Sequence, residues 1–174
     1  NCAELKKILT GCKFVIQKNQ KGTADAIEAA KQHIKTENFI ILFGDVPLIT
    51  SNSLKKLIRS FKNKNSASMI AFKTFKPKGY GRVIINNNKV TKVVEEINTS
   101  ANEKIIELCN SGIMLIKKSI FYKYVKLIKF NKKKNERYLT DIFEIYFKKN
   151  IPSSFILSSE EEVSGVNNLT DFNK

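Results

Sequence analysis

Asp45 is the first residue of this sequence whose surroundings suggest chemistry. It follows directly on the apolar run 39–43, FIILF, and on Gly44. A short continuous apolar run predicts a strand buried on both faces, and ligands of α/β proteins bind beyond the carboxyl ends of such strands. A carboxylate there is suited to Mg²⁺, which proteins hold with one or two carboxylates and substrate oxygens. The alternative is that Asp45 only shapes a turn ahead of Pro47.

A second candidate is the segment 17–26, QKNQKGTADA, in which Gly22 and Thr23 open a predicted helix behind Gln17 and Gln20. Free N–H groups at a helix start and amide side chains can bind a nucleobase or a phosphate. Threonine is also a routine helix cap, so the segment alone leaves both interpretations open. Neither GxxxxGK[ST] nor GxGxxG occurs in the chain, which removes the usual support for an ATPase or a dehydrogenase.

Four later segments carry groups suited to a sugar or a hard cation. They are GYGR at 79–82, VVEE at 93–96, NSG at 110–112 and SGVNN at 164–168. Glycine lets the backbone approach a ligand closely, and an amide oxygen can complete the shell of a hard cation. Carboxylates and amides also bind sugar hydroxyls. Taken singly, each segment is more simply explained as a turn or as paired surface acids.

Other kinds of chemistry lack the residues they need. The only histidine is His33, and Cys2, Cys12 and Cys109 show no CxxC spacing. Metal sites with several imidazoles, a Ser-His-Asp arrangement, a structural zinc site and a disulfide framework are therefore disfavoured. The odd cysteine count fits a reducing compartment, and we expect a cytoplasmic protein.

The elements that must position these groups alternate between helices and strands. Apolar periodicity predicts helices over about 23–35, 52–62, 119–129 and 139–148, with Thr23 and either Ser51 or Asn52 as caps. It predicts strands over 39–43, 67–73, 111–118 and 154–158, and an inserted hairpin that turns at Asn86 to Asn88. This order predicts an α/β fold with a mostly parallel sheet covered by helices.

Charge and length limit the partners. The chain has 174 residues, enough for one domain, and a net charge of +15 in which only Arg59, Arg82 and Arg137 are arginines. Nucleic-acid sites favour the guanidinium fork, and abundant Lys, Asn and Ile indicate a compositional bias, so we expect no nucleic-acid partner. The charge would still attract a nucleoside triphosphate. No run approaches the ~20 apolar residues of a membrane span, so we expect no membrane partner.

The order and spacing of the motifs resemble one family, the uridylyltransferase (pyrophosphorylase) domain of bifunctional N-acetylglucosamine-1-phosphate uridyltransferase/glucosamine-1-phosphate acetyltransferase. The matching segments reach from about residue 17 to the end: QKNQKGTADA, LFGDVPLI, GYGR, VVEE, NSGI, RYLTD and EVSGVNN. The resemblance implies a Rossmann-like, GT-A-like nucleotidyltransferase sheet in a single partial domain over 1–174. It implies formation of UDP-N-acetylglucosamine and pyrophosphate from UTP and N-acetylglucosamine 1-phosphate, for peptidoglycan and lipopolysaccharide precursors.

The resemblance also implies roles for single residues. Mg²⁺ would be held by Asp45, which is thereby the catalytic residue, and by Asn167. The uracil end of UTP would be bound by Gln17, Gln20, Gly22 and Thr23. The sugar phosphate would be bound by Gly81, Glu95, Asn110 and Thr140, with Tyr138 nearby.

Three departures from the family pattern accompany the match. The glycine-rich GxGTRM loop that cradles the triphosphate would precede the first residue, and the acetyltransferase β-helix is absent. Asp25 stands where a His is common, and Phe43 where a Tyr is common. We therefore expect a monomeric fragment of impaired activity, whereas the full-length family is trimeric. The alternatives are a nucleotidyltransferase for another sugar 1-phosphate or nucleotide, and a basic nucleic-acid-binding module using lysines of 117–134 and 148–149.

Overall fold

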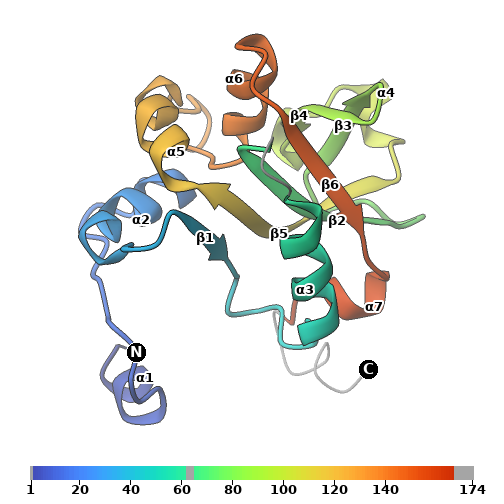
Figure 1. Ribbon diagram of the computed structural model, residues 1–174. Helices are drawn as coiled ribbons and strands as arrows, with labels where there is room; N and C mark the ends of the chain where they lie inside the picture. The colour runs from blue at the N-terminus through green and yellow to red at the C-terminus, as the bar shows by residue number, and fades with distance from the viewer. Residues whose placement is uncertain (1, 62–64, 167–174) are drawn as a thin grey trace.

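Two apolar faces of one β-sheet organise the described part of this chain, residues 2–61 and 65–166 of the computed structural model (Figure 1). The strands are β1 (Asn38–Ile41), β2 (Ala67–Lys73), β3 (Arg82–Asn86), β4 (Lys89–Val94), β5 (Leu108–Lys117) and β6 (Ser153–Leu157). Their order is β4-β3-β5-β2-β6, and β1 also pairs with β5. The predicted strand 67–73 and the hairpin are confirmed, and Asn87 and Asn88 take the positive φ angles that a tight hairpin turn requires.

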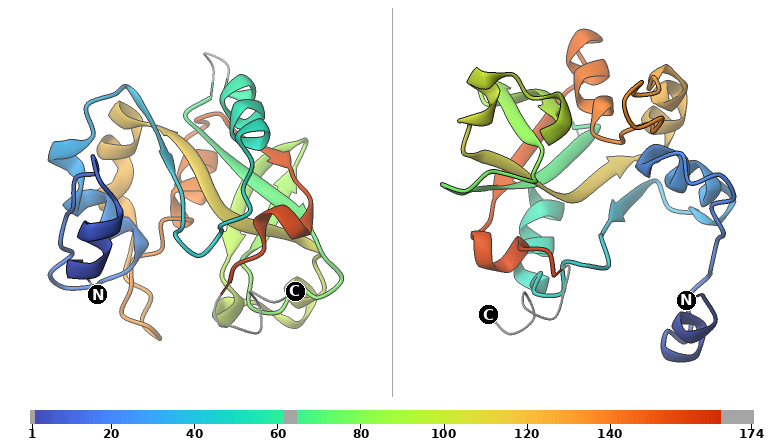
Figure 2. Two further views of the ribbon diagram at one scale, coloured as in Figure 1. Left: turned by 90° about the horizontal axis from the view of Figure 1, so that it is seen from below. Right: turned by 180° about the vertical axis from the view of Figure 1, so that it is seen from behind.

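Helices lie against both faces of the sheet, with α6 (Asp141–Lys148) on one face and α3 (Ser51–Ser60) on the other, whereas α1 (Cys2–Ile8) stands apart from the sheet (Figure 2). The predicted helices are confirmed as α2 (Thr23–Ala29) with the 3-10 turn η1 (Lys31–His33), α3, α5 (Lys118–Tyr124) with η3 (Val125–Leu127), and α6. Shorter elements are α1, η2 (Glu96–Asn98), α4 (Ala101–Lys104) and α7 (Glu160–Val163). None of the described helices is long and apolar enough to cross a membrane.

Side chains of β2 alternate between two clusters, because successive residues of a strand point to opposite faces. Met69 packs in the cluster that contains Phe143 of α6, whereas Ile70 packs in the cluster that contains Leu57 of α3. Six successive residues of β2, 67–72, are buried. Coverage on both faces therefore explains why this strand reads as a continuous apolar run.

The prediction of a mostly parallel sheet is wrong for the described residues. Only β2 and β6 pair in parallel, while β1–β5, β2–β5, β3–β5 and β3–β4 are antiparallel. The reason is the ten-residue strand β5, which begins after the hairpin and runs back between β2 on one side and β1 and β3 on the other. β1 and β3 thus run in the direction of β2 but are separated from it by β5, which opposes all three.

The prediction that 39–43 is a strand buried on both faces is also wrong. β1 ends at Ile41, the one buried residue of the strand, and Leu42 beyond it is 50% exposed. Within the described residues β1 pairs only with β5, so its second edge has no neighbouring strand. Apolar character alone did not reveal this difference, because edge and central strands can share the same residue types.

A β-bulge interrupts β5 opposite the centre of β2. Met69 pairs with Met114 and Ala71 pairs with Asn110, so three residues of β5 lie opposite Ile70 alone. The Ser111 hydroxyl donates to the Ile70 carbonyl at 2.7 Å and accepts from the Ile113 N–H at 3.2 Å, which replaces the interrupted ladder. Bulges re-aim side chains and are frequent beside functional sites.

Glu162 of α7 attaches the C-terminal helix to the start of α3. Its carboxylate accepts hydrogen bonds from the Thr50 N–H at 2.8 Å, the Ser53 hydroxyl at 2.8 Å, and the hydroxyls of Thr50 and Ser158. Burial opposes ionisation of this carboxyl, but the hydrogen bonds prevail and lower its pKa to about 2. Thr50, not the predicted Ser51 or Asn52, caps α3 by accepting from the Ser53 N–H at 3.2 Å.

We predict that Glu162→Ala lowers the free energy of unfolding by about 2 kcal/mol, because the buried Ser53 hydroxyl, the half-buried Ser158 hydroxyl and the exposed donors of Thr50 lose their common acceptor. Glu161→Ala is the matched control, since this neighbouring carboxylate is exposed, and it should change stability by less than about 0.5 kcal/mol. Urea denaturation measures both. Equal effects of the two substitutions would contradict the role given to Glu162.

The same carboxylate gives a pH signature. Because its folded pKa of about 2 lies below the ordinary 4.5, its contribution is complete above about pH 4.5 and is lost as the pH falls towards 2. The stability difference between the wild type and Glu162→Gln should therefore shrink over that range. A difference that stays constant from pH 7 to pH 2 would show that ionisation of Glu162 is not involved.

Candidate functional site

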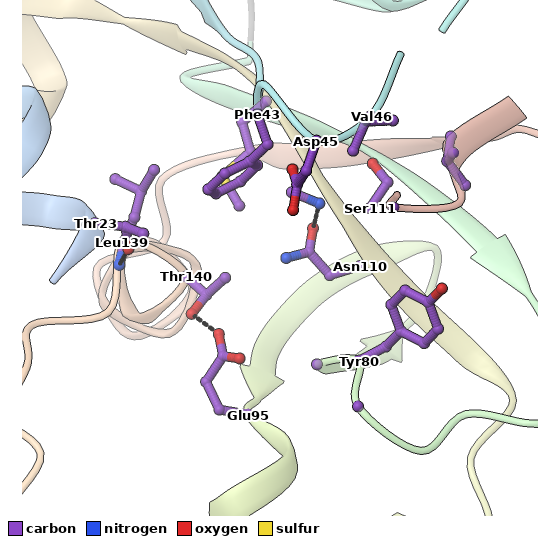
Figure 3. A pocket seen from close by; sticks show the side chains of 16 residues that line it. Thr23, Phe43, Asp45, Val46, Tyr80, Glu95, Asn110, Ser111, Leu139 and Thr140 are labelled. Atoms are coloured by element: carbon purple, nitrogen blue, oxygen red, sulfur yellow. Dashed lines mark hydrogen bonds between the residues drawn. The ribbon is translucent and has the colours of Figure 1, made fainter. Parts of the chain in front are cut away.

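The interrupted edge of β5 opens into a cavity of about 310 Å³. β1 pairs with β5 at residues 114–117 and β3 pairs with it at Cys109, so residues 110–113 lie between the two neighbours. The cavity is lined by Thr23, Phe43, Asp45, Val46, Gly79, Tyr80, Gly81, Glu95, Asn110, Ser111, Gly112, Met114, Leu139, Thr140, Val163 and Gly165 (Figure 3). Segments far apart in the sequence therefore meet where the sheet leaves this edge of β5 uncovered.

Six of the residues expected to bind substrate or metal line this one cavity. They are Thr23, Asp45, Gly81, Glu95, Asn110 and Thr140. Figure 3 shows the side chains of Asp45, Glu95 and Asn110 converging on the cavity. The sequence predicts that Asp45 follows the carboxyl end of a buried parallel strand. In the described structure it follows β1, which pairs only with β5.

Asp45 lies in the loop that follows β1, and its side chain is exposed to the cavity. Its backbone carbonyl accepts a hydrogen bond from the Val166 N–H at 2.7 Å, which attaches the late SGV turn to this loop. Asn167, the second expected metal ligand, lies outside the described residues. The described chain thus brings the residue immediately before Asn167 into contact with the backbone of Asp45.

The bulge in β5 orients the side chain of Asn110. Its Oδ1 accepts from the Gly112 N–H at 3.0 Å, and its own N–H donates to the Gly81 carbonyl at 2.8 Å. Gly112 has φ +84°, and a Cβ on it would lie 2.3 Å from the Phe43 ring. A side chain at position 112 would therefore displace Phe43 from the cavity wall, so Gly112 is required both for the turn and for the close approach.

Glu95 and Thr140 form the opposite wall. The Thr140 hydroxyl donates to Glu95 Oε1 at 2.6 Å, and a Cβ on Gly81 would lie 3.4 Å from Glu95 Oε2. Burial raises the pKa of Glu95, although the Thr140 hydrogen bond acts in the opposite direction. Burial, together with the negative charges of Glu95 and Glu144, raises the pKa of Asp141 to about 6. This wall can accept hydrogen bonds from hydroxyl or amide groups of a ligand.

The GYGR loop is held in place by a buried arginine. Arg82 is 1% exposed, and its guanidinium donates to Glu96 at 2.6 Å and to the Tyr80 carbonyl. Glu96 also accepts from the Gly79 N–H at 3.1 Å. These bonds attach the cavity wall at residues 79–81 to Glu96, the neighbour of Glu95 in the sequence.

A second cavity, of about 590 Å³, adjoins the first at Thr23, which lines both. It is lined by Val15, Ile16, Gln17, Gln20, Gly22, Thr23, Ala26 and Glu136. These include all four residues expected at the uracil end of a nucleotide. Gln17 Nε2 donates to the Gly22 carbonyl at 2.9 Å, so its amide is oriented along the turn that precedes α2.

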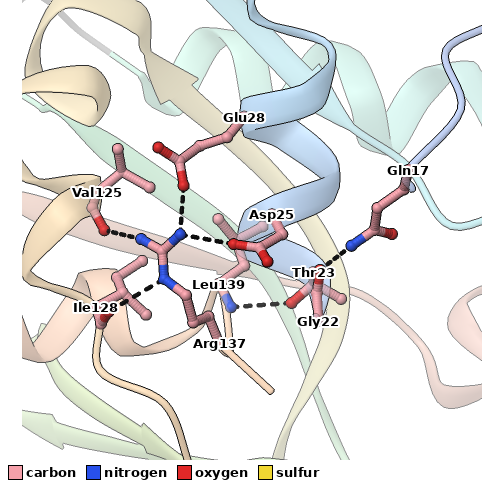
Figure 4. Close-up of polar contacts among 9 residues, drawn as sticks. All are labelled: Gln17, Gly22, Thr23, Asp25, Glu28, Val125, Ile128, Arg137 and Leu139. Carbon is pink, nitrogen blue, oxygen red and sulfur yellow. Dashed lines mark hydrogen bonds and ion pairs between the residues drawn. The ribbon is translucent and has the colours of Figure 1, made fainter. Parts of the chain in front are cut away.

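Thr23 has a different structural role from the one predicted. Gly22, with φ +99°, is the residue before α2, and Thr23 is the first residue of the helix rather than its cap. The Thr23 hydroxyl accepts from the Leu139 N–H at 2.9 Å, so it joins α2 to the segment that leads into α6 (Figure 4). Thr23 therefore lies where the two cavities adjoin.

Two residues singled out from the sequence lie outside both cavities. Tyr138 lines neither cavity, and burial, together with the charges of Glu136, Glu95 and Asp141, raises its pKa. Asp25 points away from both and pairs with Arg137 at 2.6 Å. It does not contribute to the uracil-side cavity.

Several lining residues were not singled out by the sequence. The apolar Val46, Met114, Leu139 and Val163 carried no signal, because they read as ordinary core residues. Gly112 and Phe43 lay inside the motifs NSGI and LFGDVPLI, but their mutual contact joins positions that are distant in the chain. Asp141, the last residue of RYLTD, lines neither cavity, although burial and the charge of Glu95 raise its pKa.

Two carboxylates line the first cavity, Asp45 and Glu95. Glu95 already accepts the Thr140 hydroxyl, so Asp45 is the candidate for binding a cation. Within residues 2–61 and 65–166, no group of three or more His, Cys, Asp or Glu side chains could hold a metal ion. A zinc-type site is therefore absent from that part of the chain. A Mg²⁺ ion needs fewer protein ligands, since one or two carboxylates together with substrate phosphates and water suffice, and Asp45 at an open cavity fits that donor set.

Comparison with curated proteins shows long matches to part of a bifunctional protein. The Bifunctional protein GlmU of Rhodopseudomonas palustris (strain BisB5) is 34% identical over 166 residues, covering 94% of this chain and 37% of the relative. That of Campylobacter fetus subsp. fetus (strain 82-40) is 35% identical over 149 residues, covering 86% and 34%. The chain thus spans about a third of the length of these relatives.

Solved structures confirm the expected Rossmann-like nucleotidyltransferase fold. A Bacillus anthracis protein described as a glucose-1-phosphate thymidylyltransferase, in complex with a sucrose, has a TM-score of 0.65 at 21% identity and covers 88% of this chain and 57% of its own. A UDP-glucose pyrophosphorylase complexed with UDP-glucose has a TM-score of 0.66 at 20% identity, with 88% and 62% covered. Finally, the family model for Nucleotidyl transferase matches residues 3–162, and the chain therefore belongs to the nucleotidyl transferase family.

Proposed function

We propose that this chain binds UTP and N-acetylglucosamine 1-phosphate and forms UDP-N-acetylglucosamine and pyrophosphate. The observation that carries the proposal is the pair of adjoining cavities that share Thr23. One cavity gathers amides and a helix start, and the other gathers carboxylates, an amide and a hydroxyl. The curated relatives named GlmU support this choice of substrates.

The uracil end of UTP would occupy the second cavity. Gln17 and Gln20 offer amide groups that can donate and accept, which suits the edge of a pyrimidine ring. Gly22 lets the turn before α2 pack directly against the Arg137 backbone, because a Cβ there would lie 2.6 Å from the Arg137 carbonyl oxygen. Thr23 would lie where the nucleotide passes from one cavity to the other.

The sugar phosphate would occupy the first cavity. Glu95 would accept hydrogen bonds from sugar hydroxyl or amide groups, because one of its oxygens already receives the Thr140 hydroxyl and the other faces Gly81. Asn110 Oδ1 is engaged by Gly112, which leaves its Nδ2 to donate to a ligand oxygen. Gly81 and Thr140 would complete the wall, with Tyr138 behind it.

Mg²⁺ would be held by Asp45 and by Asn167. When bound, it supplies charge neutralisation for the phosphate oxygens. The reaction transfers the uridylyl group: a phosphate oxygen of the sugar phosphate bonds to the α-phosphorus of UTP as the bond to the bridging oxygen of the leaving pyrophosphate breaks. The chain's own residues hold the two substrates in line, since such transfer depends on positioning and charge more than on covalent catalysis.

The proposed metal site leads to a prediction for Asp45. Wild-type chain should bind UDP-N-acetylglucosamine saturably in calorimetric titration with Mg²⁺, and Asp45→Asn should weaken that binding about tenfold, the loss of one charged ligand. Without Mg²⁺ the two proteins should bind alike. Glu161→Gln, which removes an exposed acid away from the cavity, is the control. Absence of saturable binding by the wild type would contradict the proposed substrates.

Another prediction concerns the sugar wall. Glu95→Gln should weaken binding of UDP-N-acetylglucosamine about tenfold while changing the affinity for UDP less than about twofold, because Glu95 would contact only the sugar. Competition by UDP-glucose should be weaker than by UDP-N-acetylglucosamine. If the two sugars compete equally, the alternative of another sugar 1-phosphate as substrate is favoured.

A further prediction concerns pH. Asp141 has a folded pKa of about 6 against an ordinary 3.8, so the folded state binds the extra proton between these values and loses stability as the pH rises through them. Asp141→Asn should therefore be about as stable as the wild type near pH 4 and more stable by about 1–2 kcal/mol above pH 6. Thermal unfolding at several pH values measures the difference. A stability difference independent of pH would contradict it.

A further inference from the structure

The Arg137 guanidinium connects three segments around the second cavity. It donates to the carboxylates of Asp25 at 2.6 Å and of Glu28, both on α2, and to the carbonyls of Val125 at 2.6 Å and Ile128 at 3.2 Å (Figure 4). Its side chain is 12% exposed. The N–H groups of a guanidinium point in fixed directions, so this largely buried group holds its acceptors by geometry as well as by charge.

The backbone of the same residue fixes the turn before α2. The Arg137 N–H donates to the Lys21 carbonyl at 2.8 Å, and the Arg137 carbonyl accepts from the Ala24 N–H at 3.1 Å. A Cβ on Gly22 would lie 2.6 Å from the Arg137 carbonyl oxygen. The turn at residues 22–23 is therefore held against Arg137 on both sides without space between them.

The attached segments belong to different cavities. Gly22 lines the second cavity, Leu139 and Thr140 line the first, and Thr23 lines both. Arg137 precedes Leu139 by two residues, and the Leu139 N–H donates to the Thr23 hydroxyl. Any movement of α2 relative to the segment 137–140 would change the distance between the two cavities.

We propose that Arg137 is a positioning residue that sets the nucleotide-side cavity relative to the sugar-side cavity, with Asp25 and Glu28 as its anchors. The proposal rests on the proposed function, in which one ligand spans both cavities. Without the guanidinium, the carboxylates of residues 25 and 28 would repel each other at a spacing of three on one helix face. Asp25 is thus a partner of Arg137 rather than a ligand contact.

The test compares UDP-N-acetylglucosamine, which would span both cavities, with uridine, which would occupy only the second. Calorimetric titration with Mg²⁺ measures both ligands for Arg137→Met, Arg137→Lys, Asp25→Asn and the double variant of Asp25→Asn with Arg137→Met. Arg59→Met is the matched control, because this arginine is exposed on α3. Partial unfolding lowers the fitted number of sites, whereas mispositioning changes the dissociation constant, so the two are separated in each titration.

We expect Arg137→Met to weaken binding of UDP-N-acetylglucosamine about tenfold or more while changing binding of uridine less than about threefold. Arg137→Lys and Asp25→Asn should show smaller losses in the same direction, since each keeps part of the attachment, and the double variant should be no worse than Arg137→Met. If Arg137→Met does not fold, Arg137→Lys and Asp25→Asn provide the comparison.

Equal weakening of the two ligands, or no weakening of either, would overturn the positioning role while leaving the proposed function intact. A wild-type chain that binds neither ligand would overturn the proposed function, and the positioning role with it. The two failures are distinguished by the wild-type titrations alone.

Discussion

The site depends on one interruption of strand pairing. Between Cys109, which pairs with β3, and Met114, which pairs with β1, the edge of β5 lacks a neighbouring strand in the described structure. The bulge at the same residues would leave backbone groups without partners, and the Ser111 hydroxyl compensates by bonding both Ile70 and Ile113. Because Gly112 accepts a positive φ there, Asn110 and the Phe43 ring can both reach the cavity.

Loops and helix ends form much of the cavity walls beside β5, and buried or half-buried charged groups attach several of these segments to one another. Arg82 and Glu96 close the GYGR loop, Glu162 attaches the start of α3 to α7, and Arg137 attaches α2 to the segment before α6. Loops lack the repeated hydrogen bonds of a sheet, so directional polar groups take over that role. Breaking such a group leaves a charge without its partner, so we expect each to be sensitive to substitution.

A transfer between two bound substrates needs their relative placement more than it needs a reactive side chain. The arrangement of two cavities with a shared residue, Thr23, is consistent with that need in a chain that has one histidine. The chain belongs to the nucleotidyl transferase family, whose name describes a transfer of this type.

The sequence by itself determined the local elements and most members of the site. Strand 67–73 and the asparagine turn of the hairpin follow from residues within a few positions of one another, and so does the placement of Asp45 just after a strand. The motifs also identified Glu95, Asn110 and Thr140. Only the tertiary structure decided that β5 opposes its neighbours, that β1 pairs with β5 alone among the described residues, that Gly112 lies under Phe43, and that Asp25 pairs with Arg137. Each of these depends on groups far apart in the chain, whose meeting is decided by packing of the whole sheet rather than by local periodicity or turn chemistry.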